Sequence, residues 1–528
     1  MKIKIHRITL LSPLVAVMAL STWMLPAQNG ASGSLDGTVS DVSGAVVPAA
    51  QVVVTNQANG VTESVSTSGN GFYSASNLQG GDYQLVVTKD GFRTNTIRNI
   101  HLDPGARRGI DVKLLVGATT AQVTVEADTV AVQTESGENG GTISAKQVSQ
   151  LMLDGRNFQT LATIVPGVTA VTGANQLGPG GASNGGQTQL SVGGTSVEQT
   201  AYIVDGIYDS VPSGNLTLSV LPAIDSIQEF RVLENNYGAN YGFAGSGQIL
   251  VQTKSGGNEY HGTGYDYIRN NNFWTAQNYF HQPGTPFGLH QNIFGYALGG
   301  PVIIPKIYNP TPKKTFFFAS GQWYLSNSSQ SLTRAFFPQP MRTGDFSASP
   351  TLPTSDKLSL DANSTALLAG RGLNPATCLS AGPNGQINQI NQVCMDPVSV
   401  ALMNAYFPLP NAVVPGQFNN YVNSTPQKLF DSNVLYRFDH AINDKNQLMG
   451  RLMYEETNIQ LAARNYNDPA PNPGAASYTT GLNAMLRWTA NITPHITNSA
   501  QIAENFQKGT NTLRGMYTLP EEIGRAHV

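Results

Sequence analysis

The chain has 528 residues, a formal net charge of −3 and only 12% charged residues. Few charges combined with 54 glycines are typical of β-rich, turn-rich proteins that work outside the cytoplasm. Because the chain has neither a basic net charge nor a run of Lys and Arg, nucleic acid is not an expected partner.

The N-terminus has the three-part layout of a secretory signal peptide, predicted over residues 1–27. Lys2 and Arg7 precede an apolar stretch at residues 8–25, and small residues around Ala27 follow. A retained membrane anchor is the alternative, because the stretch is about as long as the shortest membrane spans. The polar residues that follow at once favour export and removal. No later stretch is apolar enough for a spanning helix, so membrane residence would require β-strands.

Residues 33–117 predict a small β-sandwich. Short β runs follow one another at close spacing, and Tyr83, Leu85 and Val87 occupy alternate positions of one run, just before the turn dipeptide Asp90-Gly91. Several short strands within about eighty residues are the pattern of a sandwich.

This segment also contains a series of motifs, namely Gly37-Thr38-Val39, residues 44–50, Val52-Val53-Val54, Gly71-Phe72-Tyr73, Gly81-Asp82-Tyr83 and Gly91-Phe92. With these motifs it resembles the carboxypeptidase regulatory-like domain, a transthyretin-like sandwich. The resemblance implies a non-catalytic domain, and the chain shows no His and Glu at zinc-peptidase spacing. A carbohydrate-binding role and a plain structural spacer both remain open for it.

A helical segment is predicted to begin after Ser144, which can cap it, and to end at Pro166-Gly167. Apolar residues recur through it at roughly helical spacing, from Val148 to Val165. A glycine-rich loop at residues 173–186 follows.

The stretch from residue 225 to 262 joins this compact region to a run of long strands. It contains Glu229, Val232, Ala239, Tyr241, Gly242, Ala244, Gly247, Ile249, Thr253, Lys254 and Gly256. With the earlier Asp205-Gly206 turn, this pattern resembles the plug domain of TonB-dependent outer-membrane receptors, which implies an α+β plug at residues 119–256. The plug motif comprises Asp205, Gly206, Tyr241, Gly242, Gly247, Thr253 and Lys254. Asp205 could be a catalytic acid or a metal ligand, but the turn-forming role of Asp-Gly is favoured.

The resemblance gives a meaning to the short β run just before the plug. Val123, Thr124 and Val125 form a candidate TonB-box segment, which would pair as an added strand with a TonB-like energy transducer. An ordinary linker strand is the alternative.

From residue 258 to 521 the sequence predicts the first strands of a transmembrane antiparallel β-barrel. In Thr480 to Thr489, apolar residues including Leu486 and Trp488 share one face, and Asn483 and Arg487 share the other. Likewise Tyr436 and Phe438 oppose Arg437 and Asp439, although Leu435 breaks the alternation. About seven strands of about ten residues are predicted, with connections that alternate between long and short, as in outer-membrane barrels. The long ones would face outward.

Residues 294–302 and 314–318 include FGY, GGPV and KTFFF motifs, which are similar to those of the Oar-like branch of the TonB-dependent receptors. Plugged transporters of this kind have 22 strands, so about seven predicts a C-terminally truncated chain that does not insert stably. Residues 522–528 resemble sequencing-adaptor read-through and are interpreted as an artefactual tail.

The chain has two cysteines, Cys378 and Cys394, and in an exported protein they are candidates for a disulfide. Free thiols are the alternative. Two cysteines without a neighbouring pair of histidines fall short of a zinc site. We therefore expect no metal, no cofactor and no catalytic residue. The histidines are scattered and lack a partnered nucleophile, so the protein is not expected to be an enzyme.

The expected function is that of a TonB-dependent receptor and transporter in the cell outer membrane. The sandwich and plug would lie on the periplasmic side, and the partners would be the energy transducer, outer-membrane lipid and an unidentified ligand, with an oligosaccharide and a siderophore as candidates. The alternative is a surface or adhesion protein that organises the envelope and carries a carbohydrate-binding-like sandwich.

Overall fold

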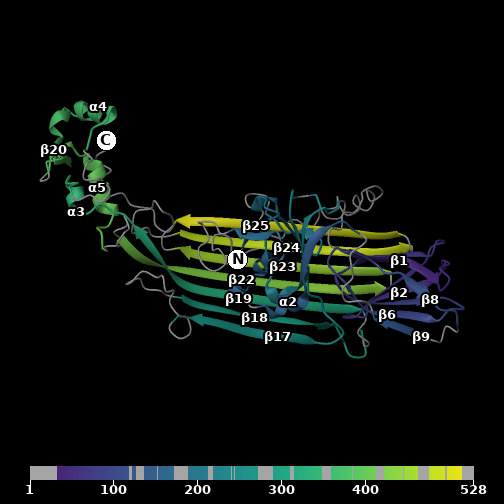
Figure 1. Cartoon of the computed structure of the whole chain (residues 1–528). Coiled ribbons are helices and arrows are strands. Elements are labelled where there is room, and N and C mark those ends of the chain that lie inside the picture. The colour runs from purple at the N-terminus through teal and green to yellow at the C-terminus, as the bar shows by residue number, and fades with distance from the viewer. Residues whose placement is uncertain are drawn as a thin grey trace, which may run out of the picture.

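The computed structural model describes residues 32–117, 122–126, 136–151, 153–171, 188–211, 218–238, 241–242, 244–271, 289–309, 314–347, 358–382, 385–411, 421–443, 445–461, 475–493 and 496–513. The predicted signal peptide, the glycine-rich loop and the predicted tail lie outside these residues. The chain forms three parts (Figure 1): an N-terminal sandwich (residues 32–126), an inner unit (residues 136–256) and a long-stranded sheet, here called the barrel sheet (residues 261–513). In the described residues, no helix is long and apolar enough to cross a membrane.

The sandwich consists of two sheets around its own apolar core. One sheet has the order β4-β1-β7, with β8 also on β1, and the other has the order β3-β2-β5-β6-β9. The strands are β1 (Gly33–Asp41), β2 (Gln51–Asn56), β3 (Thr62–Ser66), β4 (Phe72–Leu78), β5 (Gly81–Thr88), β6 (Thr94–Leu102), β7 (Arg107–Gly109), β8 (Val112–Leu114) and β9 (Gln122–Glu126). Tyr83, Leu85 and Val87 are all buried in the core, as their alternation predicts.

Strand β9 contains the candidate TonB-box residues, and it lies in the sandwich. It pairs in parallel with β6, with Val123 opposite Asn95 and Val125 opposite Ile97. It is the last strand of its sheet, so its other edge is unpaired among the described residues. The predicted plug boundary at residue 119 assigns β9 to the plug, whereas β9 pairs with the sandwich strand β6.

The inner unit contains a five-stranded sheet of order β10-β15-β16-β13-β14. Its strands are β10 (Asn139–Ile143), β13 (Ala201–Val204), β14 (Ile207–Tyr208), β15 (Ile227–Asn235) and β16 (Gln248–Thr253), and a separate pair is formed by β11 (Val168–Val171) and β12 (Gln189–Val192). The pairing of β13 with β16 is parallel, whereas β15 pairs with β16 antiparallel.

The prediction of a single helix between Ser144 and Pro166 is wrong, because the α-helix ends early and two 3₁₀ turns replace its remainder. Helix α2 (Ala145–Gln150) has Ser144 as its N-cap, with Gln147 completing a capping box. Two 3₁₀ turns then follow, η1 (Asp154–Arg156) and η2 (Phe158–Ile164). Gly155 has a φ of 71°, which is outside the helical region and breaks the helix at this point.

The barrel sheet has seven antiparallel strands in the order β17-β18-β19-β22-β23-β24-β25. They are β17 (His261–Asn270), β18 (Leu289–Pro301), β19 (Thr315–Arg334), β22 (Tyr421–Asn443), β23 (Asn446–Leu461), β24 (Ala475–Thr493) and β25 (Ile496–Leu513). The predicted count of about seven strands agrees with the described residues, but several strands run well beyond the predicted length of about ten residues. The β19–β22 ladder, for example, continues from Thr315 and His440 to Arg334 and Tyr421. The sequence pattern of this far portion is polar, so the apolar alternation used for the prediction stops before the strands do.

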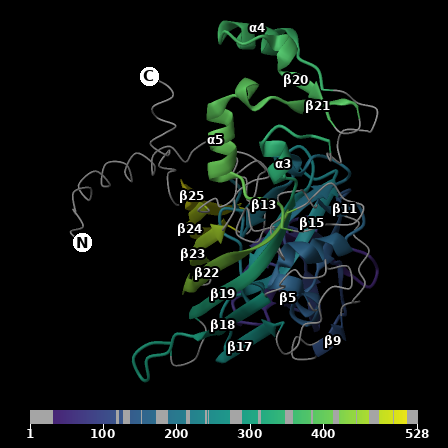
Figure 2. The same cartoon turned by 90° about the vertical axis from the view of Figure 1, so that its left-hand side faces the viewer.

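The connections of the barrel sheet differ in length at its two ends. Residues 271–288, 335–420 and 462–474 connect strands at one end, and residues 302–314, 444–445 and 494–495 connect them at the other. The sandwich lies at the end with short connections, where Ser76 Oγ is 3.3 Å from Thr497 Oγ1. Residues 335–420 contain α3 (Gln339–Arg342), α4 (Ala362–Gly370), α5 (Pro397–Tyr406), β20 (Leu379–Ala381) and β21 (Ile387–Ile390), all at the opposite end (Figure 1). Figure 2 shows the inner unit against one face of the sheet.

Cys378 and Cys394 are joined by a disulfide within the insertion at residues 335–420. Because the bond closes a loop of sequence separation 16, chain-entropy arguments give it about 3 kcal/mol of local stabilisation. We expect reduction, or Cys378→Ser, to expose the insertion to protease while the barrel sheet stays protected. Mass spectrometry with and without reductant, followed by limited proteolysis, measures both effects. Loss of protection throughout the chain would contradict this local role.

Candidate functional site

The candidate site lies where the inner unit meets the barrel sheet, and Asp205 is at its centre. Asp205 and Gly206 form the two-residue turn between β13 and β14, with φ angles of 48° and 88°. The carboxylate of Asp205 accepts hydrogen bonds from Thr253 N at 2.9 Å and from Thr253 Oγ1 at 2.7 Å. Two residues of the predicted plug motif are therefore bonded together at the end of the inner sheet.

Three arginines from adjacent barrel strands converge on this turn. Arg451 Nη1 lies 2.7 Å from Asp205 Oδ2, and Arg437 Nη1 lies 3.6 Å from Asp205 Oδ1. Arg487 Nη2 donates to the carbonyl oxygen of Asp205. The side chains of Arg437 and Arg451 are fully buried, as is nearly all of the Asp205 carboxylate.

The register of the barrel sheet makes Asp205 electrostatically necessary. Arg437 on β22 and Arg451 on β23 are directly opposite partners, and like charges in that arrangement repel. Burial alone would raise the pKa of Asp205, but Arg451 and then Arg437 outweigh this effect and hold its pKa below the ordinary value. The carboxylate is thus ionised and offsets the buried positive charges.

Arg437 also connects the site to the sandwich. Its Nη1 donates to the carbonyl oxygen of Thr253 at 2.8 Å, and its Nη2 donates to Gln79 Oε1 at 2.6 Å. On its own strand it pairs with Asp439 at 2.9 Å. One guanidinium group therefore contacts the sandwich, the inner unit and the barrel sheet.

An apolar seam surrounds this polar centre. The core of the inner unit continues into four inward-facing barrel residues, which are Ala297, Phe318, Leu435 and Met453. Leu435, which broke the alternation in the sequence, is fully buried because it packs against this core and does not face water. Tyr436 and Phe438 on the opposite face are 47% and 43% exposed, as the alternation predicts.

A second buried carboxylate, Asp209, lies a few residues beyond the turn. Burial raises its pKa to about 7, against the opposing effect of Arg451. No sequence pattern marked Asp209, because an isolated Asp after a strand is usually a solvated turn residue. Arg451 was missed as well, since apolar residues occur on both faces of β23 beside it, Leu448 and Leu452 on one and Met449 and Met453 on the other.

The remaining plug-motif residues have packing positions away from Asp205. Tyr241 is buried beside Tyr237, with ring centroids 6.0 Å apart. Gly247 faces Val192 so closely that a Cβ atom there would come within 2.5 Å of it. Burial lowers the pKa of Lys254 against the effect of Asp225. Gly242 follows Tyr241 directly and is exposed. The aromatic residues of the first long connection lie outside the described residues.

Gly481 lies where the barrel sheet contacts the inner unit closely, and a substitution there tests how closely the two fit. A Cβ atom at this position would lie 1.9 Å from the carbonyl oxygen of Ser219, which is backbone and cannot yield easily. We expect Gly481→Val to destabilise the chain by about 1–3 kcal/mol, the usual cost of overpacking. The matched control is Gly450→Val, because only Leu486 Cδ1, at 3.7 Å, lies near that position. Equal thermal midpoints for the two variants in detergent would contradict the close fit.

The antiparallel sheet has an apolar outer face and an inner face that carries buried charges, the pattern of an outer-membrane barrel. Residues 252–521 match the family described as the outer membrane beta barrel domain, and residues 34–115 match the carboxypeptidase regulatory-like domain. The chain belongs to the outer membrane beta barrel family, and this places it in the outer membrane.

A curated relative is the TonB-dependent transporter Oar of Myxococcus xanthus, which is 27% identical over 305 residues. The match covers 52% of this chain and 26% of the relative, so the chain spans about a quarter of its length. Solved structures with detectable similarity include the outer membrane transporter YddB of Escherichia coli (9% identity, TM-score 0.39, 70% of this chain and 39% of that one). The siderophore receptor PiuA of Acinetobacter baumannii is another (11% identity, TM-score 0.35, 71% and 46%).

Proposed function

We propose that the protein is an energy-coupled outer-membrane receptor and transporter in which the inner unit is the plug. The observation that carries the proposal is the buried contact of Asp205 with Arg437 and Arg451, which fixes the inner unit to the inward face of the barrel sheet. The name of the Myxococcus relative supports it. The mechanism involves binding and gating, with no bond chemistry.

Opening requires that the charges at Asp205 be separated or rehydrated. A buried charge left without its partner costs about 3–5 kcal/mol, so any movement that separates Asp205 from the arginines before water reaches them is opposed. A TonB-like transducer would supply the work. The Val123–Val125 segment is a candidate attachment point because β9 is an edge strand, and an edge strand can accept a further strand. Gln79 and Arg437 provide a route from the sandwich to Asp205.

The domain scheme within this proposal is a signal peptide at residues 1–27, a sandwich at 33–117, a plug at 119–256 and barrel strands at 258–521. Ligand would bind at the end of the sheet that carries the long connections, which we assign to the outside, with the sandwich and plug toward the periplasm. An oligosaccharide and a siderophore remain the candidate ligands. The sandwich would then be either a carbohydrate-binding module or a spacer.

A surface or adhesion role is the second candidate function. The observation that favours it is the insertion at residues 335–420, which carries its own helices, a strand pair and a disulfide at the end opposite the sandwich. A separately stabilised outer structure of this kind suits contact with a surface as well as ligand capture.

The two functions differ in their dependence on energy. The gene for this protein is deleted in its host and restored with wild type or with Asp205→Asn, and uptake of candidate ligands is measured with and without the energy transducer. Transport predicts uptake that is lost with either the gene or the transducer. Unchanged uptake in the deletion strain, combined with lost adhesion, would favour the surface role instead.

A further inference from the structure

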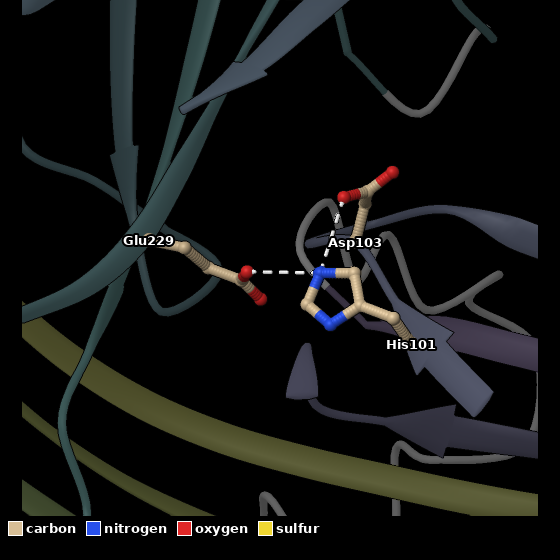
Figure 3. Close-up of side chains that lie close together, drawn as sticks. All are labelled: His101, Asp103 and Glu229. Atoms are coloured by element: carbon tan, nitrogen blue, oxygen red, sulfur yellow. Dashed lines mark ion pairs between the residues drawn. The ribbon is translucent and has the colours of Figure 1, made fainter. Parts of the chain in front are cut away.

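A cluster of ionisable side chains lies between the sandwich and the inner unit, away from Asp205. His101 at the end of β6, Asp103 in the following turn and Glu229 on β15 place one ligand-type atom each within 4.8 Å of one another. Figure 3 shows the ring of His101 between the two carboxylates, with its Nε2 atom toward both. The Nε2 atom is 3.5 Å from Asp103 Oδ1 and 3.2 Å from Glu229 Oε2.

We propose that this cluster binds a divalent cation of the Zn²⁺ type, with His101 Nε2, Asp103 and Glu229 as its protein ligands. Ligands at 2.0–2.2 Å from a tetrahedral zinc ion are about 3.4 Å apart, which is close to both Nε2 separations. The fourth position would be taken by water. Sequence spacing hid the site because Glu229 lies more than a hundred residues beyond His101 and Asp103 and comes from a different domain.

The other side of the imidazole ring is arranged as in zinc proteins. His101 Nδ1 lies 2.9 Å from Asp82 Oδ1 on the neighbouring strand β5. A carboxylate at this position accepts a hydrogen bond from Nδ1–H, so the proton stays on Nδ1 and the lone pair of Nε2 is directed at the proposed metal. Such partners fix the tautomer and raise the affinity of the histidine for the ion.

Glu229 supplies an independent reason to expect a cation. Its side chain is 1% exposed, and its Oε1 atom lacks a hydrogen-bond partner among the described residues. A buried carboxylate oxygen without a partner is costly unless a cation neutralises it. Figure 3 shows the carboxylate of Glu229 directed at the ring of His101.

The charge balance points the same way. With a neutral imidazole, Asp82, Asp103 and Glu229 give the cluster a formal charge of −3. Of the cations nearby, Arg231 acts on Asp103 but also pairs with Glu138 at 3.2 Å, and Arg108 donates to the carbonyl oxygen of His101. A dication would remove most of the excess negative charge.

The backbone at Gly80 holds the two halves of the site in register. Gly80 N donates to Gln252 Oε1 at 2.7 Å, and Gln252 Nε2 donates to Gly80 O at 2.8 Å. A Cβ atom at Gly80 would come within 2.4 Å of Glu229 Oε1. The sandwich thus approaches the inner unit closely enough for a single ion to bridge them.

The test is a titration of the full chain, purified in detergent and freed of metal, with Zn²⁺ by calorimetry and with Co²⁺ by visible spectroscopy. We expect one site with a Kd below about 10 µM and the ligand-field bands of tetrahedral Co²⁺. Asp82→Asn should weaken binding by about 10–100-fold, the usual effect of removing a carboxylate behind a histidine ligand. His101→Ala should abolish the bands, whereas His261→Ala, at an exposed position on β17, should leave them unchanged.

A glycine pair tests whether the close approach of the sandwich to Glu229 is needed, because a side chain at position 80 would displace the Glu229 carboxylate while every ligand residue is kept. Gly80→Val should weaken Zn²⁺ binding at least about tenfold by separating the sandwich from Glu229, as misplaced ligands do. Gly69→Val, with nothing within 4 Å of its Cβ position, should not. Absence of saturable binding to the wild-type chain would overturn the proposal, and so would wild-type affinity in His101→Ala. Either result would leave the cluster as an ion pair of protonated His101, and neither bears on the transport proposal.

Discussion

Asp205→Asn is expected to destabilise the contact between the inner unit and the barrel sheet by about 3–5 kcal/mol. Asparagine suits the turn nearly as well as aspartate, because it also tolerates positive φ and can precede glycine in the same turn type. The substitution therefore removes the charge and keeps the turn. It leaves Arg437 and Arg451 opposite each other in a buried setting without a counter-ion, which is the costly way to break an ion pair.

Thermal unfolding in detergent and protease sensitivity of the inner unit measure this effect. The control is Asp90→Asn in the exposed Asp-Gly turn of the sandwich, which should leave both quantities unchanged. The folded-state pKa of Asp205 is lowered, so the ionised carboxylate adds to the free energy of unfolding. This stabilisation is complete above the pKa of an unfolded aspartate and is lost as the pH falls through the lowered value. If both variants unfold like wild type at neutral pH, the ionic contact does not hold the inner unit in place.

Asp209 is expected to make stability fall as the pH rises. Its folded-state pKa is about 7, above the ordinary 3.8, so the folded protein favours the protonated acid. The stabilisation that protonated Asp209 provides is complete below the pKa of this residue in the unfolded chain, and it is lost as the pH rises through about 7. The distance between the two pKa values corresponds to roughly 4 kcal/mol.

This effect appears as a difference between two unfolding curves. The free energy of unfolding of wild type and of Asp209→Asn is measured from pH 4 to pH 8, and the wild type should lose several kcal/mol more than the variant over that interval. Comparing variants matters because Glu63 in the sandwich also has a pKa raised by burial to about 7. Parallel curves for wild type and Asp209→Asn would show that Asp209 stays charged throughout.

The sequence was most informative where one physical pattern acts over a whole element. Alternation located the β5 core positions and the two faces of β24, because period-two burial is visible in any strand with one apolar side. It failed at the outer ends of β19 and β22, where both faces are polar and only the ladder of backbone hydrogen bonds defines the strand. It also failed at Gly155, since a glycine inside an apolar helical pattern can be tolerated or can break the helix.

The candidate site was predictable only in part. The Asp205-Gly206 turn followed from its dipeptide, but the convergence of Arg437, Arg451 and Arg487 depends on the register between three strands, which the sequence does not specify. The position of β9 on the sandwich was likewise invisible, because a short Val/Thr run pairs equally well with many edges. Family resemblance identified the segments, and pairing in space determined their contacts.

The length of β19 and β22 has a consequence for what lies above them. A strand of 20 residues is about 65 Å long at 3.3 Å per residue, and a tilt of about 40° still gives a height near 50 Å. The apolar belt of an outer-membrane barrel is only about 25 Å tall. The two strands therefore extend about 25 Å beyond the height of the apolar belt, and the disulfide-closed insertion lies at the end of the sheet opposite the sandwich.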